Sequence, residues 1–218
     1  MKITWIGHSC FKIEKDDYAI VLDPYEDGSV PGLGPVREHA DLVLCSHEHA
    51  DHNFRGGVTL SGRTKTPFSI ETMHTWHDEV KGAKRGDNQI FIIDDGENRI
   101  THLGDLGCEL TPEQTRKLQN LDAVLVPVGG FYTIDARQAA QLVKSLHPRI
   151  VIPMHYRSER EQYGYDVIGT IDAFTELMDS AMEVPGSAIE TTDEQGAQVI
   201  VLRPENRAAN QNATVLFG

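Results

Sequence analysis

The side chains best suited to bind a metal ion lie within six consecutive residues, at positions 47–52. These residues read His-Glu-His-Ala-Asp-His. His47 and His49 are two positions apart, so their imidazoles can turn to one side and share one ion. Asp51 and His52 lie just beyond and can reach a second ion roughly 3.5–4 Å from the first, the usual separation in two-metal sites. A solvated surface loop is the alternative, but three histidines within six residues beside an aspartate favour a metal site.

An apolar run leads directly into this segment. Residues 41–46 read Asp-Leu-Val-Leu-Cys-Ser, which predicts a buried strand. The end of a strand fixes the position of the loop that follows it, and metal ligands need such precise placement. The histidine-rich segment is therefore expected at the end of a strand.

Three further candidate ligands also stand at or just after predicted strands. They are His77, Asp105 and His155. His77 is preferred to His74 because it begins a loop. Since strand ends gather at one edge of a sheet, a single site could collect all of these side chains. We assign His47, His49 and His77 to a first ion. We assign Asp51, His52 and His155 to a second ion, with Asp105 as the bridge.

The rest of the chain predicts a mixture of strands and helices in one domain, residues 1–218. The expected strands are 2–6, 11–14, 18–22, 67–72, 89–93, 99–103, 122–127, 149–153 and 197–202, and the expected helices are 111–119, 135–146 and 166–183. Consecutive short strands at the start favour an antiparallel or mixed sheet. An Asp-Gly turn predicts a hairpin at 89–103, and Thr111-Pro-Glu-Gln114 predicts a capping box. Residues 25–40 are expected to form a surface loop, and residues 204–218 a loosely ordered tail.

Composition limits the partners. A net charge of -13 and a pI near 5.1 oppose general binding to the phosphates of a nucleic acid. Three widely spaced cysteines form no disulfide framework. We find no secretory signal and no run of about 18 apolar residues, so a soluble, cytoplasmic protein is expected.

The order of these motifs resembles the metallo-β-lactamase fold superfamily. The resemblance rests on His-x-His-x-Asp-His after a buried strand, then a lone histidine, a Gly-Asp pair and a histidine that ends a strand, over roughly residues 1–157. Gly7-His8, Trp76-His77-Asp78, Gly129-Gly130 and Ile152–Tyr156 are similar to a small intracellular branch of zinc-dependent hydrolases that includes ascorbate-6-phosphate lactonase. The resemblance implies an α+β fold, a four-layer αββα sandwich with the metals at one edge between two mixed sheets. It also implies the ligand roles assigned above.

The expected chemistry is hydrolysis by a hydroxide that bridges two divalent ions. Asp51 and Asp105 are the candidate catalytic carboxylates, and Asp51 would orient the water or accept its proton. Six residues are candidates for substrate contacts: His8, Arg85, His102, Tyr132, Tyr156 and Arg157. A small ester, lactone or phosphodiester is the expected substrate.

Alternatives remain for the metal and the reaction. Zn²⁺ is the favoured ion, but a ligand set of histidine and aspartate also suits Mn²⁺ or iron. A nuclease of the ribonuclease Z type, an iron-dependent redox enzyme and a metal-binding protein without catalysis are the other functions considered. The sequence is also compatible with a homo-oligomer, and it does not identify the substrate.

Overall fold

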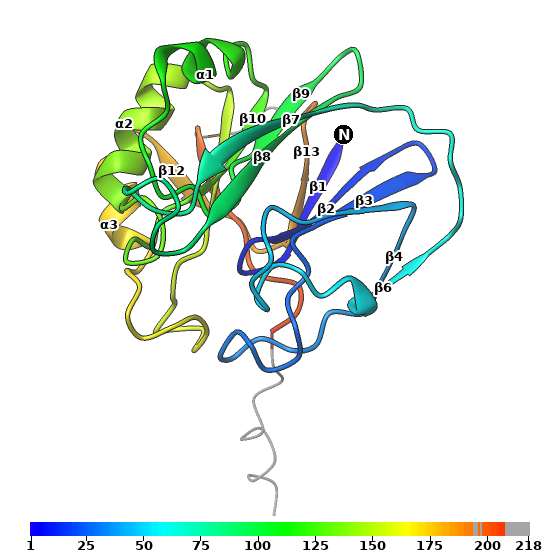
Figure 1. The fold of residues 1–218 in the computed structure, drawn as a ribbon, viewed down its shortest axis with the longest axis horizontal. Helices are drawn as coiled ribbons and strands as arrows, with labels where there is room; N and C mark the ends of the chain where they lie inside the picture. Colours follow the sequence, from blue (N-terminus) through cyan, green and yellow to red (C-terminus); the bar gives the residue numbers. More distant parts are fainter. Residues whose placement is uncertain (194–195, 197, 208–218) are drawn as a thin grey trace, which may run out of the picture.

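Two β-sheets form the centre of the protein in a computed structural model, which describes residues 1–193, 196 and 198–207 (Figure 1). The first sheet has five strands. In spatial order they are β13 (Ala188–Glu190), β1 (Lys2–Gly7), β2 (Cys10–Lys15), β3 (Tyr18–Leu22) and β5 (Leu42–Leu44). Only the pair β3 and β5 is parallel, so this sheet is mixed.

The second sheet has seven strands and is also mixed. In spatial order they are β12 (Ala181–Glu183), β14 (Val199–Val201), β11 (Ile150–Met154), β10 (Ala123–Pro127), β9 (Arg99–His102), β8 (Asp87–Asp94) and β7 (Ser69–Trp76). The strands from β12 to β9 are parallel, whereas β8 is antiparallel to both of its neighbours. The hairpin predicted around the Asp-Gly turn is therefore confirmed as β8 and β9.

Helices cover the outer face of the seven-stranded sheet (Figure 1). They are α1 (Pro112–Lys117), α2 (Ala136–Leu146) and α3 (Asp172–Thr175). The capping box predicted at Thr111 is present in α1, and Asp135 forms a second one in α2. These caps satisfy the free N–H groups of the first turn and fix where each helix begins. The predicted helix at 135–146 is confirmed.

The fourth layer of the sandwich is reduced. On the side of the five-stranded sheet that faces away from the seven-stranded sheet, the described part of the chain has no α-helix. It has loops, the 3-10 turn η1 (Arg55–Gly57) and a small sheet of β4 (Glu38–Ala40) and β6 (Val58–Leu60) (Figure 1). Between His52 and His77 the chain forms η1, β6 and β7 and no α-helix. The predicted α+β sandwich with two mixed sheets is confirmed.

The helix predicted at 166–183 is wrong. Only the four residues of α3 are α-helical, and β12 occupies the end of the segment. The apolar spacing predicts that Val167 and Ile168 both lie on the buried face of a helix. In the structure Ile168 is buried, but Val167 is 53% exposed. The backbone of Gly169 instead bonds to two other loops: its N–H donates to the carbonyl of Gly129, and its carbonyl accepts the N–H of Arg157. These bonds prevent the i to i−4 pattern of a helix.

Six strands deliver their carboxyl ends to one edge of the sandwich. In the first sheet β1, β3 and β5 run in the same direction, and in the second sheet β7, β9 and β11 do so. Each is followed by a histidine or an aspartate within a few residues: His8, Asp23, the segment 47–52, His77, Asp105 and His155. Both sheets therefore contribute polar side chains to the same place.

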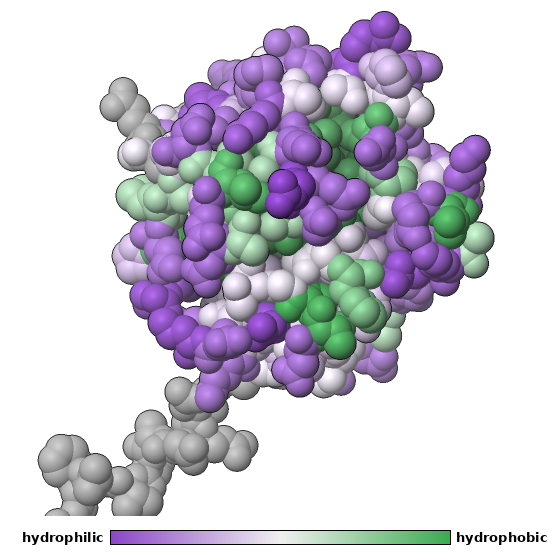
Figure 2. Space-filling view, turned by 90° about the vertical axis from the view of Figure 1, so that its left-hand side faces the viewer, coloured by the Kyte–Doolittle hydropathy of each residue, from purple (hydrophilic) through white to green (hydrophobic). Residues whose placement is uncertain are grey.

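The end of the described chain is attached to the first sheet. Glu205 and Asn206 donate their backbone N–H groups to the carbonyls of Trp5 and Ile6. The remainder of the predicted tail, residues 208–218, lies outside the described residues, and the single domain stays a prediction. Among the described residues, no helix has both the length and the apolar character needed to span a lipid bilayer. The helical side of the molecule shows a mainly hydrophilic surface with small hydrophobic areas between (Figure 2).

Candidate metal centre

Three histidines form the first group of candidate ligands. His47 and His49 follow β5, His77 follows β7, and one ring nitrogen of each lies within 4.8 Å of the others. The backbone N–H of His77 donates to the carbonyl of Gly86, which holds the end of β7 against the loop that follows it. His74, three residues earlier, instead pairs with Asp87 and has a side chain that is 47% exposed. The structure therefore brings His77, not His74, to the group.

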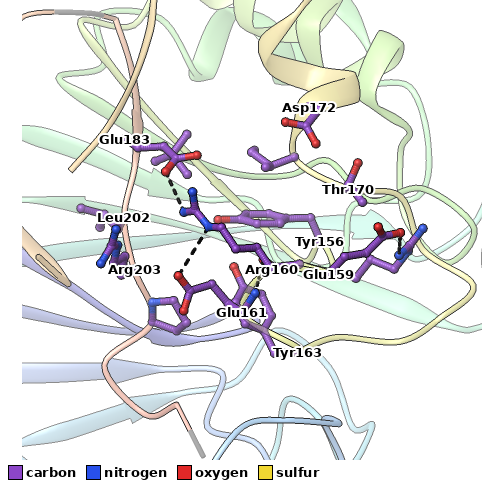
Figure 3. Close-up of a pocket in the computed structure, with 15 residues that line it drawn as sticks. Tyr156, Glu159, Arg160, Glu161, Tyr163, Thr170, Asp172, Glu183, Leu202 and Arg203 are labelled. Atoms are coloured by element: carbon purple, nitrogen blue, oxygen red, sulfur yellow. Dashed lines mark hydrogen bonds and ion pairs between the residues drawn. The ribbon is translucent and has the colours of Figure 1, made fainter. Parts of the chain in front are cut away.

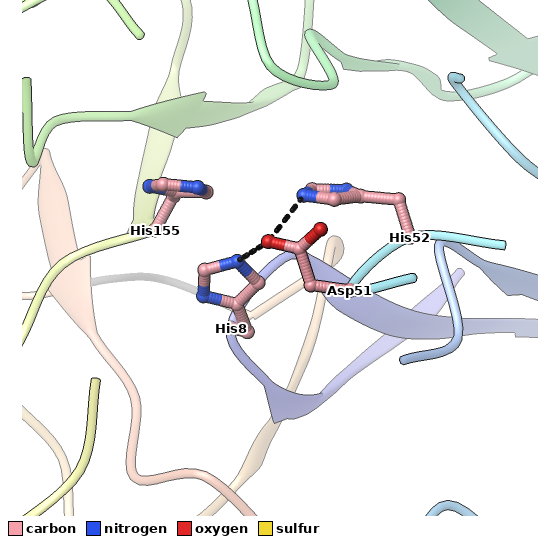
Figure 4. A group of neighbouring side chains, drawn as sticks. All are labelled: His8, Asp51, His52 and His155. Carbon is pink, nitrogen blue, oxygen red and sulfur yellow. Dashed lines mark ion pairs between the residues drawn. The ribbon is translucent and has the colours of Figure 1, made fainter. Parts of the chain in front are cut away.

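A second group contains His8, Asp51, His52 and His155, again within 4.8 Å of one another (Figure 4). Asp51 Oδ2 lies 3.3 Å from His8 Nε2 and 3.7 Å from His52 Nε2. His8 and His155 both have a φ of 53°, a left-handed conformation that is uncommon for residues other than glycine. Such backbone strain tends to be kept at functional sites.

Asp105 lies between the two groups. Its Oδ2 atom is 3.2 Å from the Nε2 atoms of both His52 and His155, and 3.4 Å from that of His77. His47 Nε2 is 4.0 Å away. One carboxylate oxygen thus faces imidazoles of both groups, which is the position that a bridging ligand needs. The structure brings together all seven residues predicted as ligands, and their role as ligands remains a proposal.

The buried polar atoms of this cluster fit metal ions. His47 Nε2, His52 Nε2, His155 Nε2 and Asp105 Oδ1 are buried and have no hydrogen-bond partner. Leaving such atoms without a partner costs about 1–3 kcal/mol each, so buried polar atoms without partners require an explanation. Nitrogen and carboxylate oxygen atoms that converge in this way are the donors that Zn²⁺, Mn²⁺ and iron accept.

The ionisation of the cluster also suits cations. Burial lowers the pKa of His47 to about 3, and burial together with His155 lowers the pKa of His8 to about 4, so both imidazoles are neutral at pH 7. Burial opposes the charge of Asp105, but His155 and His52 outweigh it and hold its pKa well below the usual 3.8. Neutral imidazoles and ionised carboxylates are the forms that bind metals.

His52 shows the opposite behaviour. Burial works against its protonation, but Asp105 and Asp51 raise its pKa well above the usual 6.5. A proton on His52 therefore balances the two carboxylates, and a cation bound between these groups would displace it. Metal binding at this cluster is thus expected to release a proton.

Asp23 orients two of the histidines, and the sequence analysis missed it. His52 Nδ1 donates to Asp23 Oδ2 over 2.9 Å, and Ser46 donates its backbone N–H and its hydroxyl to the same carboxylate. The Ser46 hydroxyl in turn lies 2.9 Å from His47 Nδ1. With the Nδ1 atoms engaged, the Nε2 atoms of His47 and His52 face the cluster, and that of His52 can bind a metal once its proton is released. The only signal was Asp23-Pro24 at the end of a predicted strand.

Two other residues support the ligands and were also missed. Asn88 accepts the backbone N–H of Asp105 on its side-chain oxygen and donates to the carbonyl of Leu103, which fixes the turn after β9. The hydroxyl of Tyr165 lies 3.1 Å from Asp51 Oδ2 and 2.8 Å from the carbonyl of Ser29. Neither residue stands in a motif, so only the fold reveals the contact.

Of the predicted substrate contacts, His8 and Tyr132 lie beside the cluster, and Arg85 lies over the ring of Tyr132. The ring centroid of His8 is 4.1 Å from that of His155, and the ring centroid of Tyr132 is 6.5 Å from it. The guanidinium carbon of Arg85 lies 5.4 Å from the ring centroid of Tyr132. These three substrate contacts remain proposals.

The other three predicted contacts are directed elsewhere. His102 lies 2.9 Å from the carbonyl of Ser9 through Nε2 and accepts the N–H of Gly104 on Nδ1, so it has no free nitrogen for a ligand. Tyr156 packs against Trp5, with 5.5 Å between the ring centroids. Tyr156 and Arg157 line a separate cavity of about 360 Å³, where Arg160 pairs with Glu183 and Glu161 (Figure 3).

Known proteins resemble this chain in sequence and in fold. The family described as "Beta-lactamase superfamily domain" matches residues 2–155. A UPF0173 protein of Pyrococcus furiosus is 30% identical over 187 residues, which cover 74% of this chain and 86% of that protein. A UPF0173 metal-dependent hydrolase of Thermoplasma acidophilum is 30% identical over 191 residues, covering 72% and 84%.

A solved structure shows the same fold. It is described as a candidate Zn-dependent hydrolase of the metallo-β-lactamase superfamily from Thermotoga maritima. It is 33% identical, with a TM-score of 0.72, and the match covers 92% of this chain and 97% of that one. The chain therefore belongs to the metallo-β-lactamase superfamily, as predicted. Within it, the chain falls with the UPF0173 proteins in the class of metal-dependent hydrolases.

Proposed function

We propose that the protein hydrolyses a small ester, lactone or phosphodiester at a centre of two divalent ions, with Zn²⁺ as the favoured metal. The observation that carries the proposal is the position of Asp105, whose Oδ2 atom faces the imidazoles of both ligand groups. His47, His49 and His77 would hold one ion, and Asp51, His52 and His155 the other, with Asp105 between them. Ions bound there would supply an activated water near neutral pH and positive charge for the developing oxyanion.

The protein's own residues position the reaction. In hydrolysis the oxygen of water forms a bond to the acyl carbon or phosphorus, the bond to the leaving oxygen breaks, and that oxygen takes up a proton. Asp51 is half-buried, and the neighbouring imidazoles His52 and His8 overcome the effect of burial and lower its pKa. Its carboxylate is therefore ionised and can orient the water or accept its proton.

His8 fits a role next to Asp51. Its Nε2 atom is buried, lies 3.3 Å from Asp51 Oδ2 and has no hydrogen-bond partner. Since its imidazole is neutral at pH 7, it can donate one hydrogen bond to a substrate oxygen or to Asp51, or bind a metal through the other nitrogen. The contact of His8 with Asp51 supports a role for His8 within the cluster as well as in substrate binding.

The direct test compares two histidines of the same strand region. His77→Ala is expected to lower the metal content of the purified protein and to abolish turnover. His74→Ala, which removes an exposed imidazole paired with Asp87, is expected to change neither. Elemental analysis for zinc, manganese and iron gives the identity and number of the ions. Phenyl acetate, a small lactone and bis(4-nitrophenyl) phosphate serve as substrates.

Chelation separates the alternatives. Turnover is expected to disappear after exhaustive chelation and to return with Zn²⁺ or Mn²⁺. Full activity without metal, or equal loss of metal in both histidine variants, would contradict the proposal. Cleavage of a transfer-RNA precursor by the loaded protein would indicate a nuclease instead, and iron as the only ion with oxygen consumption would indicate a redox enzyme. A cytoplasmic location and a homo-oligomer stay predictions, testable by cell fractionation and by light scattering.

A further inference from the structure

Two half-buried arginines, Arg85 and Arg203, have no acceptor for their guanidinium groups in the part of the chain that the structure describes. This is notable in a chain with 33 acidic and only 20 basic residues, in which a carboxylate is usually at hand. Arg203 lines the separate cavity, where Arg157 and Arg160 are paired with glutamates and carboxylates outnumber guanidinium groups by four to three, so the cavity offers no net positive charge to an anion (Figure 3). Arg85 has a different environment, in the loop after His77 and over the ring of Tyr132.

The position of Arg85 is fixed from two sides. Its backbone N–H donates to the carboxylate of Asp78 over 2.7 Å, which places it in the loop that begins directly after His77. Its guanidinium lies over the ring of Tyr132, 5.4 Å from the centroid. A cation held on a ring face keeps its N–H edges free to bind another partner. The ring centroid of Tyr132 is 6.5 Å from that of His155, so the ring of Tyr132 connects the guanidinium to the cluster.

Aromatic side chains continue from Tyr132 around this side of the site. Phe131 is 62% exposed, with a φ of 61°, and its ring meets that of Tyr132 edge to face at 4.8 Å. The ring of Tyr165 lies 6.0 Å from Tyr132 and 5.7 Å from His8. A phenylalanine with a positive φ costs conformational free energy, and such strain is concentrated at functional sites. Together with its exposure, this favours a role for Phe131 in binding. These rings offer an apolar surface for the organic part of a substrate.

We propose that the substrate carries an anionic group, a carboxylate or a phosphate, which binds Arg85 while the scissile bond lies at the candidate metal centre. The inference rests on the proposed function and specifies its substrate class. The planar guanidinium matches the two oxygens of either anion. Tyr132 acts as a positioning residue that holds the guanidinium in place.

The test uses three matched esters with the metal-loaded, full-length protein: phenyl acetate, its 4-carboxylate and its 4-phosphate. The variant Arg85→Gln is expected to raise KM for the two charged esters about tenfold, as expected for the loss of one charged hydrogen-bonding contact, and to leave phenyl acetate unchanged. Lys81→Gln is the matched control, because it removes the same charge from an exposed side chain of the same loop. It is expected to change every KM less than twofold.

Two results for the esters would overturn the inference. One is an equal effect of Arg85→Gln on charged and neutral esters. The other is an equal effect of Arg85→Gln and Lys81→Gln on the charged esters, since a general attraction of anions would then suffice. Tyr132→Leu is expected to raise KM for the charged esters, whereas Tyr132→Phe, which keeps the ring, leaves it near that of the wild type. The preference between carboxylate and phosphate shows which anion the site selects.

A binding measurement keeps the inference separate from the proposed function. Acetanilide, 4-acetamidobenzoate and 4-acetamidophenyl phosphate replace the ester by an amide and are used in equilibrium dialysis with the loaded protein. Arg85→Gln is expected to weaken binding of the charged amides about tenfold and not that of acetanilide. If no ester is turned over but this pattern appears, the proposed hydrolysis of esters fails and the anion site stands. If turnover occurs but neither binding nor KM depends on Arg85, only the inference fails.

Discussion

At the scale of single residues, the imidazoles of His47 and His52 each have a hydrogen-bonding partner on the side of the ring away from the cluster. Asp23 is completely buried and accepts hydrogen bonds from His52 and Ser46. Burial opposes its charge, but His52 and the neighbouring His102 outweigh it and lower its pKa. An ionised carboxylate in this place fixes the tautomer of His52 and makes its Nε2 atom a better donor to a metal.

We therefore expect Asp23→Asn to weaken metal binding about 10- to 100-fold, the usual cost of losing such a partner. Competition with a chelator of known affinity measures the change. Asp41→Asn is the control, because Asp41 is also a nearly buried carboxylate that accepts a backbone N–H, from Ala19, but at the start of β5. An equal loss of metal affinity in both variants would show that Asp23 acts only through the stability of the fold.

The sequence predicted those cluster residues whose neighbours in the chain have the same proposed role. His47, His49, Asp51 and His52 were recognisable because six positions contain the whole pattern. Asp23 was not recognisable, because its partner His52 lies 29 positions away and a single Asp-Pro pair occurs in many structural contexts. Tyr165 reaches Asp51 across 114 positions. Contacts of this kind depend on the folded chain and leave no local pattern.

At the scale of elements, close approaches of the backbone position the ends of the strands. A Cβ atom on Gly107 would lie 2.3 Å from the carbonyl carbon of His77, and one on Gly129 would lie 2.2 Å from the carbonyl oxygen of His155. The loops after β9 and β10 are thus in close contact with the backbones of two candidate ligands. The sequence predicted the capped helices but not α3 or the short strands β4, β6, β12 and β13, whose few residues give no clear periodicity.

We expect Gly107→Ala to move His77 and to reduce metal content, with a loss of stability of about 1–3 kcal/mol from overpacking. Elemental analysis and chemical denaturation measure the two effects. In Gly186→Ala the new methyl group would meet nothing closer than 3.9 Å, so metal content and stability are expected to stay within about 0.5 kcal/mol of the wild type. Normal metal content in Gly107→Ala would contradict the proposed place of His77.

The loop that carries Arg85 is organised by one carboxylate. Asp78 accepts the backbone N–H groups of Val80, Gly82, Lys84 and Arg85. Burial raises its pKa, but these four bonds outweigh burial and hold the pKa below the usual 3.8. Because the folded value is the lower one, the contribution of Asp78 to loop order is complete above pH 3.8 and is lost as the pH falls through the folded value.

Trp76 can report this change, because a Cβ atom on Gly82 would lie only 2.7 Å from its ring. Tryptophan fluorescence is expected to stay constant from pH 6 to about 4 and to change below that, before the circular dichroism signal of the sheets is lost. Asp78→Asn, which keeps one strong acceptor oxygen, is expected to show the altered fluorescence already at pH 6. Identical curves for the two proteins would remove Asp78 from this role.

At the scale of the whole molecule, the candidate metal centre connects the two sheets. Its residues follow β1, β3 and β5 on one side and β7, β9 and β11 on the other (Figure 1). Ions bound there would link the ends of β5, β7, β9 and β11. Because the unfolded chain has no preformed site, the free energy of metal binding adds to the free energy of unfolding.

We therefore expect the melting temperature to rise on loading with Zn²⁺ and to fall on chelation. At a free metal concentration of 100 times Kd, each site stabilises the fold by about 2.7 kcal/mol. Differential scanning calorimetry of wild type and of the His77→Ala and His74→Ala variants measures the effect. A melting temperature that is the same with and without metal in the wild type would contradict binding at this interface.

The distribution of these side chains along the chain also determines when the centre can assemble during synthesis. The trio His47, His49 and His77 leaves the ribosome early, but His155 follows the last strand of the series, β11. A nascent chain that ends before residue 155 lacks one imidazole of the second group. Complete occupation of the proposed centre would therefore require translation at least as far as residue 155.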